Sequence, residues 1–165
     1  MMALQLGSQW FSANWGNLAS VVGLAVSTAT LFVAKWAKEA AEQAKTEARR
    51  RNLVDELEEA QRKTEQVGSY LGQEKWEIVL LRAQEVVTSC SQILRRWGTH
   101  ELSEQSRDNI LVAQQQAGSI ARVALRAPRI PPTEQDLRRI AGAQHKALQL
   151  LSGETAEITG KIEAR

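Results

Sequence analysis

The sequence predicts an all-α protein in which one N-terminal transmembrane helix continues into a cytoplasmic helical stalk and an antiparallel helical bundle. No Asp, Glu, Lys or Arg occurs before Lys35, and the residues before it form a long apolar run. Beyond Lys35, apolar residues recur at three- and four-residue steps, which is the period of an amphipathic helix. Proline is absent until Pro128, and no apolar run alternates as a strand does. These patterns predict helices throughout.

Length and composition limit the architecture to one crossing and one domain. The chain has 165 residues, so about 125 residues follow the apolar run, enough for a modest core. Charged residues make up 24% and the net charge is +2, which indicates a folded rather than a disordered chain. The single cysteine, Cys90, excludes an internal disulfide and suits a reducing compartment.

Residues 15–36 are the predicted transmembrane helix. Trp15 and Trp36 bracket the apolar run about 30 Å apart, so an aromatic ring would lie at each membrane interface. A cleaved signal peptide is the alternative, but the run lacks a basic region before it and leads into Lys35 and Arg49–Arg51 rather than a cleavage site. This basic flank places the N-terminus outside and the rest in the cytoplasm, at the bacterial inner membrane. Residues 1–14 form either an interfacial helix on the outer leaflet or a disordered lead, and we favour the former.

One side of the predicted crossing is small and weakly polar. Small and hydroxyl side chains in membrane helices allow close backbone approach, so this side predicts self-association into a homo-oligomer, or a pore wall. The alternative is that small residues are common in any crossing. The residues of this face are Ala19, Gly23, Ser27 and Thr30.

Residues 37–72 are predicted to continue the same helix as a stalk, and residues 73–153 to form the bundle. Alanines favour helix after Trp36, and Gly68 and Gly72 suggest an end near Tyr70. A second helix spans residues 74–97 and stops at Gly98. A third begins near Ser103 or Ser106 and runs to about residue 126. After a proline-rich break, a fourth opens with Thr133 and Asp136 as its cap and ends at Gly153, and residues 154–165 form a tail expected to fray.

The sequence contains no combination of residues that indicates catalysis, so we expect a protein that is not an enzyme and needs no cofactor or metal. His100 and His145 have no neighbouring ligands at metal-binding spacing. Cys90 lies among Val86, Val87 and Ile93, as a buried structural thiol would.

Arginines gather on both sides of the proline-rich break. If the third and fourth helices are antiparallel neighbours, these guanidinium groups converge at one end of the bundle and form an anion-binding site, for a nucleotide or an oligonucleotide. The alternative is a solvated surface in contact with Glu134 and Asp136. No aromatic side chain lies nearby for base stacking, which weakens the nucleic-acid interpretation. The arginines are Arg122, Arg126, Arg129, Arg138 and Arg139.

The segment from Trp15 to Leu24, WGNLASVVGL, followed by a basic flank and an Ala- and Glu-rich helix, resembles the small single-pass membrane effectors of bacterial anti-phage defence, such as the Hailong-type channel subunit. The resemblance covers about the first third of the chain. It implies a homo-oligomeric ion channel or membrane-perturbing effector, gated through its cytoplasmic bundle by a protein partner or a nucleotide. The alternative function is a membrane-tethered adaptor, anchored in lipid, whose bundle docks a cytoplasmic partner.

Overall fold

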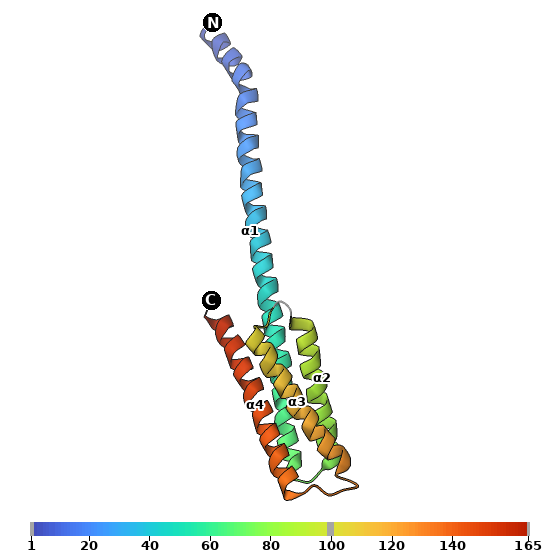
Figure 1. Ribbon diagram of the computed structural model, residues 1–165. Helices are drawn as coiled ribbons and strands as arrows, with labels where there is room; N and C mark the ends of the chain where they lie inside the picture. The colour runs from blue at the N-terminus through green and yellow to red at the C-terminus, as the bar shows by residue number, and fades with distance from the viewer. Residues whose placement is uncertain (1, 99–100, 165) are drawn as a thin grey trace. The chain divides into compact units, whose positions relative to one another are not determined.

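The computed structural model describes the backbone of residues 2–98 and 101–164, and the side chains of residues 20, 23, 24, 26–98 and 101–164. Four helices account for nearly all of these residues, and no strand occurs among them (Figure 1). The predicted all-α class is confirmed. The helices are α1 (Met2–Leu71), α2 (Trp76–Trp97), α3 (Glu104–Arg126) and α4 (Glu134–Glu163).

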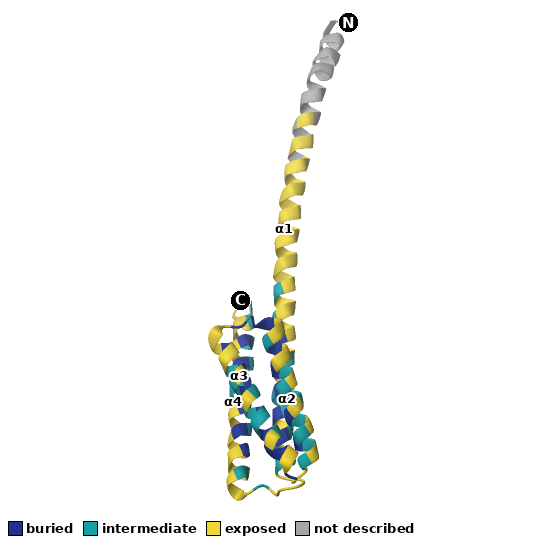
Figure 2. Ribbon diagram, turned by 45° about the vertical axis from the view of Figure 1, so that its right-hand side comes forward, coloured by how far each residue is buried: buried dark blue, intermediate teal, exposed yellow. Residues whose placement is uncertain are grey.

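The chain divides into two units, Met1–Thr46 and Glu47–Arg165, and α1 supplies residues to both. Helix α1 continues through Trp36 without a break, as the sequence predicts for the stalk. In the first unit the described side chains from Gly23 to Lys45 are all exposed (Figure 2). The side chains of residues 15–19, 21, 22 and 25, which belong to the predicted crossing, lie outside the described residues.

A search of the described residues for a helix long and apolar enough to cross a membrane finds none.

The second unit is a four-helix bundle that includes the last part of α1. The sequence predicts a stalk over residues 37–72, but the compact unit begins at Glu47. Leu53, Leu57, Ala60 and Val67 of α1 are buried. Their three- and four-residue spacing places them on one face, and that face forms part of the core.

Polar contacts between helices show how the bundle is arranged. Glu56 of α1 pairs with Trp97 of α2, and Lys63 pairs with Ser89. The higher-numbered residue of α1 pairs with the lower-numbered residue of α2, so the two helices are antiparallel. Helix α3 packs against both α2 and α4, and α4 returns to α1, where Gln144 donates a hydrogen bond to the Thr64 carbonyl (3.1 Å). The predicted antiparallel bundle therefore closes on itself, with α1 between α2 and α4.

The core consists of two groups of buried apolar side chains, one at each end of the bundle. The group near the start of α3 includes Leu57, Cys90, Ile93, Ile110 and Leu151. The group near the end of α3 includes Val67, Val79, Ala83, Ile120 and Ile140. Alanines occupy many buried positions on α3 and α4, so these helices pack closely rather than around a thick core.

The caps that the sequence predicts are present. Ser103 rather than Ser106 caps α3, because the Ser103 hydroxyl accepts from the Ser106 backbone N–H (3.0 Å). Thr133 and Asp136 form a reciprocal capping box at the start of α4. At the end of α2, a Cβ on Gly98 would lie 2.3 Å from the Leu94 carbonyl oxygen, so a side chain there would require the backbone to shift.

Helix α4 is longer than the sequence predicts. It continues past Gly153 to Glu163, so residues 154–163 are helical and not a frayed tail. Glu154 and Ile158 are buried, and Ile158 belongs to the apolar group near the start of α3. The packing of Ile158 in this group stabilises the last turns more than one glycine weakens them.

Candidate functional site

The proposed pore or association face lies on the first unit. Gly23, Ser27 and Thr30 are exposed, and their spacing places them on one side of α1. The fourth member, Ala19, has a side chain outside the described residues. The Ser27 hydroxyl donates to the Gly23 carbonyl (2.8 Å) and the Thr30 hydroxyl donates to the Val26 carbonyl (2.8 Å). Both hydroxyl protons are therefore satisfied within the helix, which makes these residues compatible with an apolar surrounding.

Large apolar side chains cover other sides of the same segment, and they too are exposed. Trp36 is 72% exposed, Leu24 is 71% exposed and Phe32 is 67% exposed. A surface on which several large apolar side chains are exposed together marks an interaction with lipid or with another protein. No contact within the described part of this unit covers it.

All five predicted arginines are exposed and lie around the connection between α3 and α4. We call Arg122, Arg126, Arg129, Arg138 and Arg139 the arginine cluster. Arg126 and Arg139 come from different helices, yet both act electrostatically on Asp136. The structure thus brings the end of α3 and the start of α4 together, as the sequence predicts.

Acidic residues offset part of the arginine cluster. Arg138 donates to Glu134 (2.6 Å), and it is the one member of the cluster that forms an ion pair within the described part of the chain. Hydrogen bonds from the Thr133 hydroxyl and backbone N–H, followed by the positive charges of Arg139 and Arg126, lower the pKa of Asp136 from its ordinary value. Asp136 is therefore a carboxylate at neutral pH, and its oxygen is already used by the cap of α4.

Two exposed apolar residues that are not among the predicted site residues lie beside the arginines in the sequence. Leu125 is 64% exposed and Ile130 is 68% exposed. Leu125 lies between Arg122 and Arg129 in the sequence, and Ile130 directly follows Arg129. The sequence does indicate that Leu125 is exposed, because its spacing places it outside the face of α3 that carries Ile120 and Ala124. The cluster is therefore basic and apolar together.

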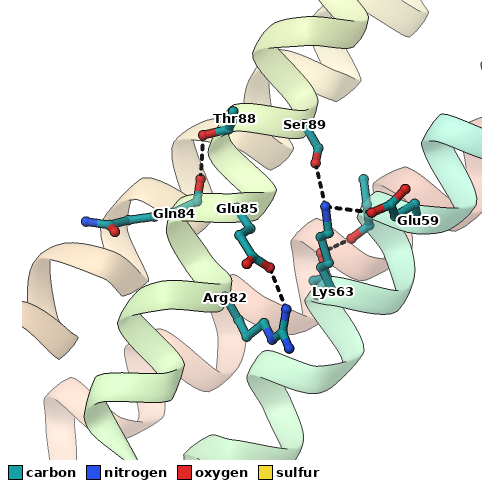
Figure 3. Close-up of polar contacts among 9 residues, drawn as sticks. Glu59, Lys63, Arg82, Gln84, Glu85, Thr88 and Ser89 are labelled. Atoms are coloured by element: carbon teal, nitrogen blue, oxygen red, sulfur yellow. Dashed lines mark hydrogen bonds and ion pairs between the residues drawn. The ribbon is translucent and has the colours of Figure 1, made fainter.

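A polar seam, also absent from the predicted sites, joins α1 to α2 (Figure 3). Lys63 forms an ion pair with Glu59 (2.9 Å) on its own helix and donates to Ser89 (3.3 Å) on α2. Further along, Glu56 accepts from both Arg96 and the Trp97 indole N–H (2.9 Å). A hollow of about 110 Å³ lies in this seam, lined by Glu56, Glu59, Lys63, Ser89, Gln92 and Ile93. These charges are paired with one another, so the seam aligns two helices and offers no unsatisfied catalytic group.

Asn109 and Glu154 form a polar contact inside the bundle. Glu154 is only 3% exposed; its Oε1 accepts from Asn109 (2.6 Å), while its Oε2 is buried without a hydrogen-bond partner. Glu154 follows Leu151 by three residues and precedes Ile158 by four, so its spacing places it on the buried face of α4. A buried oxygen without a partner costs free energy, so this residue weakens the bundle locally.

The other reactive side chains that the structure describes lack a catalytic setting. Cys90 is fully buried, and the loss of solvation raises its pKa to about 12, which keeps the thiol protonated and unreactive. His145 is exposed, and His100 lies outside the described residues. Among the residues that the structure describes, no three His, Cys, Asp or Glu side chains gather to hold a metal ion.

Comparison with protein-family models, with curated proteins and with solved structures finds no match to this chain.

Proposed function

We propose that the protein is an oligomeric, single-pass inner-membrane effector that conducts ions or perturbs the membrane through the first part of α1, under the control of its cytoplasmic bundle. The observation that carries the proposal is the exposed apolar surface of α1 before Lys35, where the sequence has no charged residue. Water is a poor solvent for such a surface, whereas membrane lipid or a second copy of the helix would cover it. The resemblance to Hailong-type subunits is the reason for placing this activity in anti-phage defence.

The oligomer is proposed to form through the face that carries Gly23, Ser27 and Thr30. No heavy atom lies within 4 Å of a Cβ built on Gly23, so a second helix has room to approach closely there. The intrahelical hydrogen bonds of Ser27 and Thr30 leave their oxygens as acceptors on the same side. Such a face can pack against a copy or line a path for cations.

Planar-bilayer recording of the full-length protein tests the proposal. The variant changes Gly23, Ser27 and Thr30 to Leu, which fills the small face while keeping it apolar. The matched control changes Ala25, Thr28 and Ala29 to Leu, three small residues that lie on the opposite side of the helix by their spacing.

We expect discrete conductance from the unchanged protein and from the control, and none from the Gly23, Ser27 and Thr30 variant. Equal currents from both variants would refute a pore on this face. Silence from an unchanged protein that forms stable oligomers in the membrane would count against ion conduction and favour the alternative below.

The alternative is a membrane-tethered adaptor, and the exposed basic and apolar arginine cluster favours it as a docking surface. Exchange of residues 15–36 for a poly-Leu helix separates the two functions. An adaptor keeps its activity after the exchange, because it needs only an anchor. A channel loses its activity, because a poly-Leu helix supplies neither the small face nor the hydroxyls.

A further inference from the structure

We propose that the arginine cluster, together with Leu125 and Ile130, is a docking surface for an acidic amphipathic helix of a protein partner. This surface rests on the adaptor alternative above and adds the chemistry of its partner, and it does not depend on membrane insertion. The occupant is a helix with Asp or Glu on either side of a row of apolar residues.

Charge is the first reason. Of the two acidic residues at the start of α4, Glu134 is paired with Arg138 and Asp136 is held by the α4 cap, and no other arginine of the cluster forms an ion pair within the described residues. Positive charge therefore remains at Arg122, Arg126, Arg129 and Arg139. A carboxylate-bearing surface complements it, because the guanidinium fork matches the two oxygens of a carboxylate.

The apolar residues are the second reason, because a ligand that carried charge alone would leave them uncovered. Leu125 is 64% exposed and Ile130 is 68% exposed. Arg122 is followed on α3 by Leu125 three residues later and Arg126 four residues later, so basic, apolar and basic side chains form a row around the last turns of the helix. A partner helix with an acidic–apolar–acidic face matches this row.

The connection between α3 and α4 fixes the backbone that carries Arg129 and Ile130. The Arg126 carbonyl accepts from the backbone N–H groups of both Arg129 and Ile130 (2.9 Å each), which fixes their turn at the end of α3. Pro131 and Pro132 then restrict the backbone before the capping box of α4. A surface organised before binding loses less conformational entropy when a partner docks.

Nucleic acid fits this surface less well. The cluster itself contains no aromatic side chain, and Tyr70 and Trp76 at the same end of the bundle are partly buried against the core, which leaves their rings less open to an unpaired base. Leu125 and Ile130 contribute little to phosphate binding but pack well against aliphatic side chains. An acidic helical segment therefore uses both parts of the surface, whereas a polyanion uses only the arginines.

Fluorescence anisotropy with the full-length protein in a neutral detergent tests the proposal. The first probe is a labelled helical peptide of about 18 residues, roughly five turns, that carries Glu and Leu in this pattern. The second probe is the same peptide with Gln in place of every Leu. The third is a single-stranded oligonucleotide of similar charge.

Three variants accompany the probes. The first reverses Arg122, Arg126 and Arg129 to Glu. Its matched control reverses Arg49, Arg51 and Arg62 to Glu, which are exposed arginines of α1 within the same unit. The third, Leu125→Ser with Ile130→Ser, keeps every arginine and serves as the decisive variant if the first fails to fold by circular dichroism.

We expect the Glu/Leu peptide to bind the unchanged protein and the control, and to bind the arginine variant about tenfold or more weakly. The serine variant should bind the Glu/Leu peptide weakly. Its affinity should not exceed the affinity of the unchanged protein for the Gln peptide. The proposal is overturned if the unchanged protein does not bind the peptide, if the serine variant binds it as well, or if the oligonucleotide binds more tightly than the peptide.

Discussion

Gly153 lies inside α4 and is exposed, and no heavy atom lies within 4 Å of a Cβ built there. Replacement by Ala therefore adds a methyl group without a clash. In a helix interior Ala is favoured over Gly by about 0.8–1 kcal/mol. For a bundle of this size, Gly153→Ala should raise the midpoint of thermal unfolding by about 3–6 °C.

Thermal unfolding of the full-length protein, followed by far-UV circular dichroism, measures the effect. A matched control is Gly68→Ala in α1, where the new Cβ would lie 2.8 Å from Gln144 Nε2 and would displace the hydrogen bond to the Thr64 carbonyl. Losing that bond costs about 0.5–1.5 kcal/mol, which cancels the gain in helix propensity. An unchanged or lower midpoint for Gly153→Ala would show that α4 ends at this glycine, as its sequence alone suggests.

Three further predictions concern the bundle. Glu56→Ala leaves the buried indole N–H of Trp97 without its acceptor and should destabilise the protein by about 1–3 kcal/mol, measured by urea unfolding; equal stability would show that water replaces the carboxylate. Glu154→Met removes a buried oxygen that has no partner, and the partly exposed Asn109 can form its hydrogen bond with water instead. Urea unfolding should therefore show a free energy of unfolding that is higher by about 1–3 kcal/mol. Cys90 should react with a thiol reagent only at the rate of unfolding, because burial raises its pKa from 9.0 to about 12. This raised pKa contributes stability below pH 9 that is lost as the pH rises toward 12, and rapid labelling at neutral pH would contradict the burial.

Much of the fold follows from rules that act within one or two helical turns. The caps at Ser103 and Thr133 depend on side chains within four residues of the backbone groups they satisfy, and at the end of α2 the Gly98 backbone N–H donates to the Leu94 carbonyl. The convergence of Arg126 and Arg139 near Asp136 follows from a short connection between antiparallel helices. Such features are predictable because the interacting groups are neighbours in the chain.

The sequence by itself therefore determined the helical class, most helix ends, the charge-free segment of α1 and the place of the arginine cluster. Only the tertiary structure decided that residues from Glu47 onward join the bundle, that α4 continues to Glu163, and that Glu56 meets Trp97 across 41 positions. It also decided that Leu125 and Ile130 stay uncovered while Glu154 is buried. The physical reason is that burial depends on which helices meet, and one helix does not carry that information alone: the same apolar spacing serves a core, an interface or a lipid-facing surface.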